Sequence, residues 1–263
     1  MRLWTWIDAR MVRLGMSFLE TCRQLLVFLR FVLDMFLSLP SVFSNFHTAV
    51  DQMYLIGITS VPLVALTSIF TGAVAAWQAA YNFADYVPLR YVGTAVGKSV
   101  MLEVGPVLTA LVVSGRVGAA MTAELGTMAV TEQIDAMKVL DLNPFRFLMA
   151  PRLLASMIML PMLTILSSFI AILGALAVVT LFKGLSPESF WYGVRLFYTN
   201  WDMFVGILKS FVFGIIIAMF GCYYGYTSTH GAEGVGRATM ASVVASNVSV
   251  LISGFLISNF LLR

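Results

Sequence analysis

The sequence is poor in charge. Asp, Glu, Lys and Arg make up 11% of its 263 residues, whereas 60% are hydrophobic and the mean hydropathy is +0.91. A soluble domain has roughly 25% charged residues, so this composition predicts an integral membrane protein. The net charge is only +3, and no basic cluster resembles a nucleic-acid-binding surface. We therefore expect no nucleic-acid partner.

Groups that carry enzymatic chemistry are also scarce. Cys22 and Cys222 are far apart and lack the spacing of a zinc site or a disulfide framework. His47 and His230, the two histidines, lie in no H-E-x-x-H pattern. With neither a metal cluster nor a nucleophile and base, an intramembrane enzyme is not indicated. We expect the chain to bind no cofactor or metal and to perform no covalent chemistry.

Two glycine-rich motifs imitate phosphate-binding loops. "VGTAVGKS" at 92–99 leaves three residues between its glycines where a P-loop needs four, and no strand precedes it. "HGAEGVGRAT" at 230–239 follows an apolar segment rather than a strand, and we interpret it as a tight cytoplasmic turn. The chain is thus not expected to hold ATP itself.

Long apolar segments dominate what is present. Five of them reach the roughly 20 residues that a helix needs to cross the hydrocarbon core of a membrane. They lie at 53–80, 100–121, 151–182, 203–225 and 240–262. Pro62 and Pro161 fall inside the first and third, where each could kink the helix. The expected fold is an all-α membrane protein with residues 51–263 as its membrane domain.

Residues 1–50 form a separate N-terminal cytoplasmic segment in this interpretation. Within it, 18–39 is a wide apolar helix along which polar residues form one stripe: Glu20, Arg23, Gln24, Arg30, Asp34 and Ser38. That pattern is typical of a helix lying in the membrane interface. The alternative is a sixth span whose polar stripe is buried in a bundle, and the sequence leaves both open.

Basic residues in the loops predict the orientation. With five spans, the side that holds the N-terminus carries Arg2, Arg10, Arg13, Arg23, Arg30, Lys138, Arg146 and Arg237, and Arg152 lies at the edge of a span on this side. The opposite side carries fewer, namely Arg90, Lys98, Lys183, Arg195 and Arg263. The excess predicts a cytoplasmic N-terminus and a C-terminus on the outer side.

Three ionisable residues lie inside the predicted spans, where a charge costs at least about 2.5–3.5 kcal/mol on insertion scales. Glu103 begins the second span and Lys209 lies about two turns into the fourth. Both spans start on the outer side, so the two residues share a similar depth. They could form a structural ion pair, or a polar collar around the head group of an amphiphile. Arg116, near the cytoplasmic end, could snorkel or meet Glu124, and we assign both a structural role.

The most charged stretch, "TEQIDAMKVLDLNPFRF" at 131–147, joins the second and third spans. It predicts a short helix with Thr131 as its N-cap and with Glu132 in its first turn. Asp135 and Lys138 are spaced to form an ion pair on this helix. The helix is therefore expected to be exposed on the cytoplasmic side.

This short helix also has an apolar face, formed by Val130, Ile134 and Met137, and Asn143-Pro144 should end it. Such a helix could rest on the membrane surface. It could instead insert into a groove on a soluble partner. The pattern alone favours neither.

Small residues recur at every fourth position in several spans, which lets helix backbones approach closely in lipid. The series are Gly115, Ala119, Ala123; Gly118, Thr122, Gly126; Gly206, Ser210, Gly214, Ala218, Cys222; and Ala241, Ala245, Ser249, Ser253. They could pack helices within one chain or form a subunit interface. Five spans make a thin wall for a pathway, which favours a dimer.

One long stretch resembles a known family. "EVGPVLTALVVSGRVGAAMTAELGTMAVTEQIDAMKVLDLNPFRFLMAPRLLA", from Glu103 to Ala155, is similar to the core of the MlaE (YrbE-like) permeases. "LKSFVFG" at 208–214 and "HGAEGVGRAT" follow in the family's order, so the resemblance covers roughly residues 50–260. It implies the membrane subunit of an ABC transporter associated with MCE proteins. Such a subunit moves phospholipids or related lipids between the inner and outer membranes of bacteria and maintains the lipid asymmetry of the outer membrane.

The resemblance also implies partners. It predicts a homodimer in the inner membrane, cytoplasmic ATPase subunits that use ATP, a periplasmic MCE-domain lipid-binding protein and in some systems a STAS-domain protein. The C-terminus would then face the periplasm. An ion-coupled secondary transporter of an amphiphile is the alternative, but it should show more acids within the membrane or an internal repeat, and the sequence has neither.

Residue roles follow from the matching motifs. Glu103 in E-x-G-P and Lys209 in K-S correspond to the family's transport region. The coupling helix that contacts the ATPase corresponds to 131–140, with Thr131, Glu132, Gln133, Asp135, Met137 and Lys138 as its candidate contacts. At the outer end of the first span, Trp77, Gln78 and Tyr81 are further candidates for lipid contact.

Overall fold

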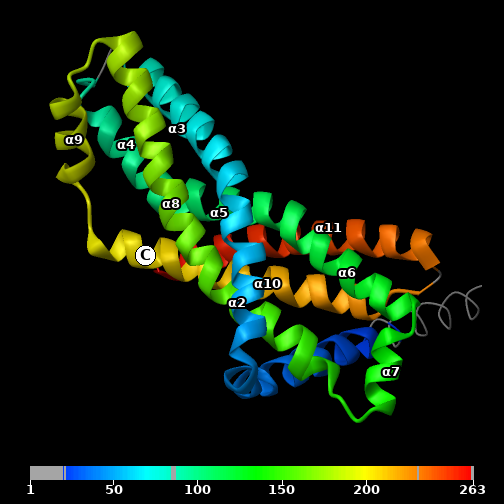
Figure 1. The fold of residues 1–263 in the computed structure, drawn as a ribbon. Coiled ribbons are helices and arrows are strands. Elements are labelled where there is room, and N and C mark those ends of the chain that lie inside the picture. Colours follow the sequence, from blue (N-terminus) through cyan, green and yellow to red (C-terminus); the bar gives the residue numbers. More distant parts are fainter. Residues whose placement is uncertain (1–19, 21, 84–86, 230, 262–263) are drawn as a thin grey trace, which may run out of the picture.

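The computed structural model of the protein describes residue 20 and residues 22–83, 87–229 and 231–261. Over these residues the chain is helical, and none of them lies in a strand. Five helical segments among them are long and apolar enough to cross a membrane: Phe46–Phe83, Tyr91–Val130, Phe145–Lys183, Asn200–Tyr226 and Gly231–Leu261. The predicted all-α fold with five spans is confirmed, and Figure 1 shows the long helices crossing one another at an angle.

The last span begins earlier than predicted. Helix α11 (Gly231–Leu261) includes most of "HGAEGVGRAT", so the predicted tight turn is wrong for residues 231–239. The chain reverses direction just before, and Gly231 has a φ of 67°, a left-handed conformation that glycine adopts without strain. Glycines and the polar residues Glu233, Arg237 and Thr239 hid this part of the helix from a search for apolar runs. His230 lies outside the described residues.

The first span is broken near its middle. It consists of α2 (Phe46–Ile56) and α3 (Val61–Phe83), joined by the 3-10 turn η2 (Ile58–Ser60). Pro62 lies in the first turn of α3, where its missing N–H is not needed, so it helps to start a helix. Pro161, in contrast, lies inside the continuous helix α8 (Ala150–Lys183).

The second span is one long helix with two π-helical segments. Along the chain it runs through α4 (Tyr91–Ser99), η3 (Val100–Val104), α5 (Gly105–Val113), η4 (Ser114–Gly118) and α6 (Ala119–Val130). The P-loop-like motif at 92–99 forms α4 and is therefore not a loop. The two π segments contain Glu103 and Arg116, two of the charged residues of this span. Single π turns are frequent at functional sites, which directs attention to both residues.

The remaining elements cap the two ends of the bundle. Helix α7 (Gln133–Val139) and the π turn η5 (Phe145–Met149) connect α6 to α8, whereas α9 (Pro187–Leu196) connects α8 to α10 (Asn200–Tyr226). Figure 1 shows α7 and α9 at opposite ends of the molecule. Before α2, the 3-10 helix η1 (Leu39–Asn45) packs against α8 and η5.

Small residues allow the spans to pack closely. Helix α8 packs against α3 and α10, and α10 packs against α11 and α6. The predicted series on α10 is buried at every position, so it packs helices within one chain. On α11 the face that packs within the chain is one residue away from the predicted series, because the buried positions are Ser242, Ser246, Val250 and Gly254. The predicted series is not buried in the single chain, so its alternative role in a subunit interface stays a prediction. Several faces of α11 carry small residues four positions apart. Contacts with α6 and α10 bury the face that contains Ser242.

The described part of the N-terminal helix, which includes residues 22–37, lies against the end of the bundle near α7 (Figure 1). Phe31 and Met35 are buried in a cluster with Leu125 and Cys222. The polar stripe is exposed apart from Ser38, so a stripe buried inside the bundle is wrong. Residues 18, 19 and 21 of the predicted helix lie outside the described residues.

Candidate functional site

A buried ion pair joins the second and fourth spans. The Lys209 side chain is fully buried (0% exposed), and its Nζ donates to Oε1 of Glu103 at 2.5 Å and to the carbonyl oxygen of Leu102 at 2.8 Å. Ser258 of α11 donates its hydroxyl to the same Glu103 oxygen at 2.6 Å. The ion pair predicted from the matching depth of the two residues is confirmed. It connects three spans through one carboxylate.

A glycine allows α10 to approach η3 at this point. A Cβ added at Gly206, one turn before Lys209, would overlap the carbonyl oxygen of Met101. The missing side chain brings the α10 backbone against η3, so that the lysine side chain reaches Leu102 and Glu103. This close approach explains how Lys209 can be buried and still have two oxygen partners.

The two partners of the ion pair differ in their access to solvent. The Glu103 side chain is 44% exposed, whereas Lys209 has no exposed surface. A buried charge is expensive in a membrane unless it is paired, and Glu103 supplies that pairing. The exposed side of the carboxylate remains available to a polar group outside the bundle. The geometry therefore permits both the structural and the functional interpretation of the pair.

A second ion pair lies toward the α7 end. Arg152 at the start of α8 is buried (3% exposed), and its Nη2 lies 2.8 Å from Oε2 of Glu124. Arg116 instead donates from Nη1 to the hydroxyl of Ser60 at 2.8 Å. The predicted pairing of Arg116 with Glu124 is therefore wrong. Roughly 12 Å of helix rise separates these two residues, whereas α8 delivers Arg152 directly to Glu124.

Helix α7 begins later than predicted. Thr131 ends α6, and its hydroxyl donates to the carbonyl of Thr127, so it is not the N-cap of α7. Glu132 takes the N-cap position with a φ of 60°. The predicted Asp135–Lys138 pair is confirmed at 2.8 Å. That hydrogen bond, together with Tyr226, raises the pKa of Lys138, whose Nζ lies 5.2 Å from the centre of the Tyr226 ring. Lys138 thus connects α7 to the end of α10.

The exposed apolar side chains of this connection are not those predicted. Ile134 is buried against the bundle, and Val130 and Met137 are partly buried. Val139 and Leu140, at the end of α7, are 86% and 70% exposed. The helix ends at Val139, before Asn143-Pro144, so the predicted end is also wrong. Asn143 instead accepts a hydrogen bond from the N–H of Phe145 at the start of η5.

The predicted lipid contacts of the first span lie on an exposed face of α3. Trp77, Gln78 and Tyr81 are all exposed. The Trp77 ring contacts Phe182 edge-on, and Nζ of Lys183 lies 4.6 Å from its centre. These contacts connect Trp77 to the end of α8 rather than to the ion pair of Glu103.

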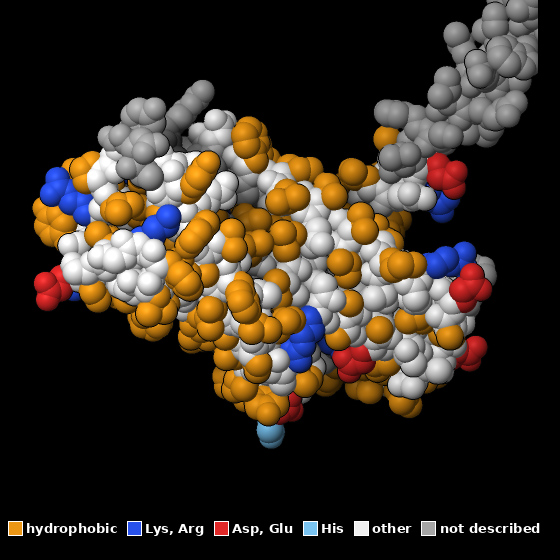
Figure 2. Space-filling model, turned by 90° about the horizontal axis from the view of Figure 1, so that it is seen from above, with side chains coloured by type: hydrophobic (Ala, Val, Ile, Leu, Met, Phe, Trp, Pro, Cys, Tyr) orange, Lys and Arg blue, Asp and Glu red, His pale blue; other side chains and the backbone are white. Residues whose placement is uncertain are grey.

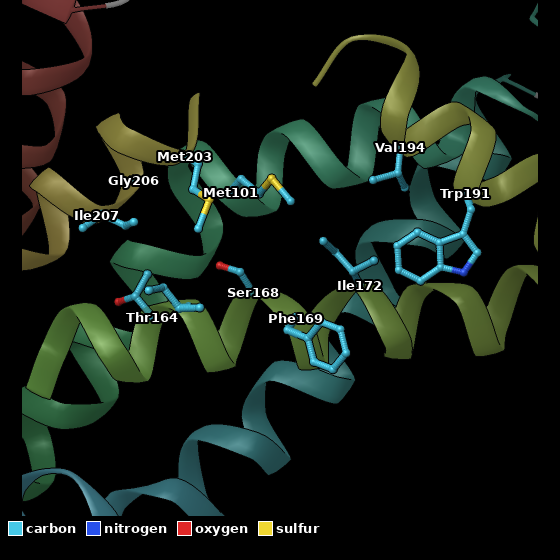
Figure 3. A pocket seen from close by; sticks show the side chains of 11 residues that line it. Met101, Thr164, Ser168, Phe169, Ile172, Trp191, Val194, Met203, Gly206 and Ile207 are labelled. Atoms are coloured by element: carbon cyan, nitrogen blue, oxygen red, sulfur yellow. The ribbon is translucent and has the colours of Figure 1, made fainter. Parts of the chain in front are cut away.

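A cavity of about 250 Å³ opens between η3, α8, α9 and α10 (Figure 3). Met101 and Met203 enter it from one side, and Ile172 and Phe169 from α8 lie on the other, while Trp191 of α9 lies near one end. Thr164 and Ser168 supply the only hydroxyl groups of its lining among the described residues. Sequence reasoning missed this cavity because four separate elements build it.

Comparison with known proteins decides the family. The family model described as Permease MlaE matches residues 49–260, which include both ion pairs, α7 and the cavity. This chain belongs to the MlaE permease family. A probable ABC transporter permease protein of Synechocystis sp. is 41% identical over 81% of each chain. One from Rickettsia typhi is 39% identical over 81% of this chain and 82% of its own.

A more distant relative comes from a plant. The chloroplastic protein named TRIGALACTOSYLDIACYLGLYCEROL 1 of Arabidopsis thaliana is 34% identical over 82% of this chain and 62% of its own length. The MlaE family match thus confirms the resemblance found in the sequence.

Arg152 is the buried charge that sequence reasoning placed only at the edge of a span. Its position just after Pro151, at a helix start, was the available signal.

Proposed function

We propose that this MlaE permease is the membrane subunit of an ABC transporter that moves phospholipids between the inner and outer membranes of a bacterium and so maintains outer-membrane lipid asymmetry. The names of the bacterial relatives support the ABC assignment, and the plant relative is named after a glycerolipid. A lipid suits the molecule physically, because its chains need apolar walls and its head group needs a few polar contacts.

The observation that carries the proposal is the Glu103–Lys209–Ser258 cluster. It places one half-exposed carboxylate, held by a buried lysine, among apolar helices. Along the second span, Glu103 and Glu124 are separated by roughly 30 Å of helix rise, about the thickness of the hydrocarbon core. The two ion pairs therefore fit the two edges of the hydrocarbon, and the Glu103 pair fits the level of a lipid head group.

Energy would come from a separate subunit. In this proposal the permease is a homodimer that binds no nucleotide, and its cytoplasmic ATPase partners contact the 131–140 region. A periplasmic MCE-domain protein would exchange lipid at the opposite face, and a STAS-domain protein would bind the ATPase in some assemblies. The α7 end, with its exposed Val139 and Leu140, supports a protein contact, because exposed apolar side chains on a charged connection favour a partner.

A lipid-transfer assay tests the proposal. The permease, reconstituted with its ATPase and MCE partners, should transfer fluorescent phospholipid between vesicles when ATP is present. Replacing Glu103 or Lys209 with Ala should reduce the rate by roughly tenfold, the effect of one lost charge-assisted contact. Glu188→Ala, on the exposed surface of α9, serves as the matched control. Unchanged transfer in both variants would restrict the pair to packing, and transfer driven by an ion gradient without the ATPase would refute the ABC assignment.

A further inference from the structure

The cavity between α8, α9 and α10 is separate from the carboxylate of Glu103. Its lining includes neither Glu103, Lys209 nor Ser258. Glu103 points toward Ser258 of α11, whereas Met101, two residues earlier, enters the cavity. The cavity is therefore a second place where the molecule could hold a ligand.

The cavity runs along the bundle from one end toward the middle. Its lining on α8 extends from Thr164 to Ile172, roughly 12 Å of helix rise. Near its outer end, exposed aromatic residues gather on α9, on the connection that follows it and at the start of α10: Tyr192, Phe197, Tyr198 and Trp201. Trp and Tyr concentrate where a membrane meets water. The cavity thus begins at the level of this interface and extends inward along α8, and its lining on α10 ends at Ile207, two residues before Lys209.

A charged group lies beside the outer end of the cavity. Met101 and Val194 line both the cavity and a small adjoining cleft, which also contains Lys98 and Asp202. Nζ of Lys98 lies 3.5 Å from Oδ2 of Asp202, and Asp202 is buried while the Lys98 side chain is 49% exposed. Asp202 therefore holds the lysine in place while about half of the Lys98 side chain remains accessible. An ammonium group has three donors, so it can bind Asp202 and an anionic ligand together.

The wall made by α9 is held firmly. Thr94 of α4 donates its hydroxyl to the carbonyl oxygen of Gly193 in α9 at 2.5 Å. Gly93 and Gly193 let the two backbones touch, because a Cβ at either position would overlap a carbonyl oxygen of the other helix. The cavity is thus formed before any ligand arrives, as is usual for small-molecule sites.

We propose that this cavity binds one acyl chain of a membrane phospholipid, with the lipid phosphate at the Lys98 ammonium group. A water molecule in a cavity needs two to four polar partners, and the lining offers two hydroxyl groups along its whole length. An apolar chain matches the methionine, isoleucine and aromatic walls. The lipid head group then lies at the aromatic level, where Lys98 is exposed. This site goes beyond the proposed function, because it is distinct from the Glu103 pair and does not require transport.

Photolabelling of the full chain in vesicles tests the acyl-chain site. The probe is phosphatidylglycerol with a diazirine in one acyl chain, and labelled peptides are identified by mass spectrometry. Labelling should concentrate on residues 164–172 and 203–207. Met203→Trp fills the cavity and should reduce that labelling by roughly tenfold, because a displaced chain loses its apolar contacts. Ile207→Trp is a second filling variant, and Met240→Trp, on an exposed face of α11, is the matched control.

The head-group contact has its own test. Lys98→Gln should reduce cavity labelling by phosphatidylglycerol severalfold, whereas Lys183→Gln, at the end of α8, should not. The proposal would be overturned if residues 164–172 and 203–207 were labelled no more than exposed residues such as Phe255 and if neither Met203→Trp nor Ile207→Trp reduced that labelling. If Met203→Trp abolishes cavity labelling but Lys98→Gln leaves it unchanged, the proposed contact between Lys98 and the lipid phosphate is refuted. The transfer assay with Glu103 variants reports on the proposed function separately, so failure of one leaves the other intact.

Discussion

At the scale of single residues, the intramembrane charges form an asymmetric pair. Lys209 has no exposed surface and depends on Glu103 and the Leu102 carbonyl, whereas Glu103 is half-exposed and also receives the Ser258 hydroxyl. Removal of one partner therefore has different consequences for the other. A buried ammonium group left with one carbonyl is costly, but a carboxylate near a surface can be solvated.

We therefore expect Glu103→Ala to destabilise the permease more than Lys209→Met does. The difference in the free energy of unfolding should be on the order of 1–3 kcal/mol, the cost of a buried unpaired polar group. Thermal unfolding of the detergent-solubilised chain measures it. The double variant Glu103→Ala/Lys209→Met should recover stability relative to Glu103→Ala alone but not lipid transfer. Equal losses in the two single variants would contradict the asymmetry.

At the scale of elements, α7 is a helix with one attached face and one exposed end. Ile134 is buried against the bundle, Asp135 pairs with Lys138, and Lys138 lies over the Tyr226 ring. The raised pKa of Lys138 means that this connection is fully present at neutral pH. It would be lost only as the pH rises through that raised value, above the ordinary lysine pKa. Lys138 is thus a side-chain contact between α7 and the end of α10.

Replacing Leu140 with Ser should weaken ATPase binding by roughly tenfold, the effect of losing one buried leucine contact. Co-purification and binding titration with the purified ATPase measure this. Leu181→Ser, an equally apolar and exposed change at the end of α8, should leave binding intact. Reversing the charges of Glu132 and Asp135 should also uncouple the ATPase without affecting membrane insertion. Normal binding in all these variants would make α7 a simple connector.

Sequence patterns predicted the elements better than their contacts. Apolar length gives five spans because the membrane sets one scale for all of them. Equal depth was enough to pair Glu103 with Lys209. The same reasoning failed for Glu124, because its partner Arg152 comes from α8 and nothing in the local sequence fixes how α8 meets α6. For the same reason the sequence did not show which face of α11 packs within the chain, one position away from the predicted series, and the cavity needs four elements at once.

At the scale of the whole molecule, an apolar surface separates two polar ends. Figure 2 shows hydrophobic side chains over most of the visible face, with few charged side chains, mainly near its edges. Figure 1 shows α7 and α9 at opposite ends of the bundle. Exposed apolar side chains on α3, α8 and α11, such as Phe70, Phe169 and Phe255, are what a surface in contact with lipid or a second subunit requires.

Sidedness decides whether the two ends can have the proposed partners. The excess of basic residues on the α7 side predicts that α7 is cytoplasmic and α9 periplasmic. Cys222 is buried, so a Cys22→Ser background leaves no exposed native thiol among the described residues. In intact spheroplasts, a membrane-impermeant maleimide should then label Glu188→Cys in α9 but not Glu132→Cys. In permeabilised cells the maleimide should label both cysteine variants. The reverse pattern would put α7 outside the cell, where no ATP-using partner could reach Leu140. Glu103 and Lys98 would then lie at the head-group level of the opposite leaflet.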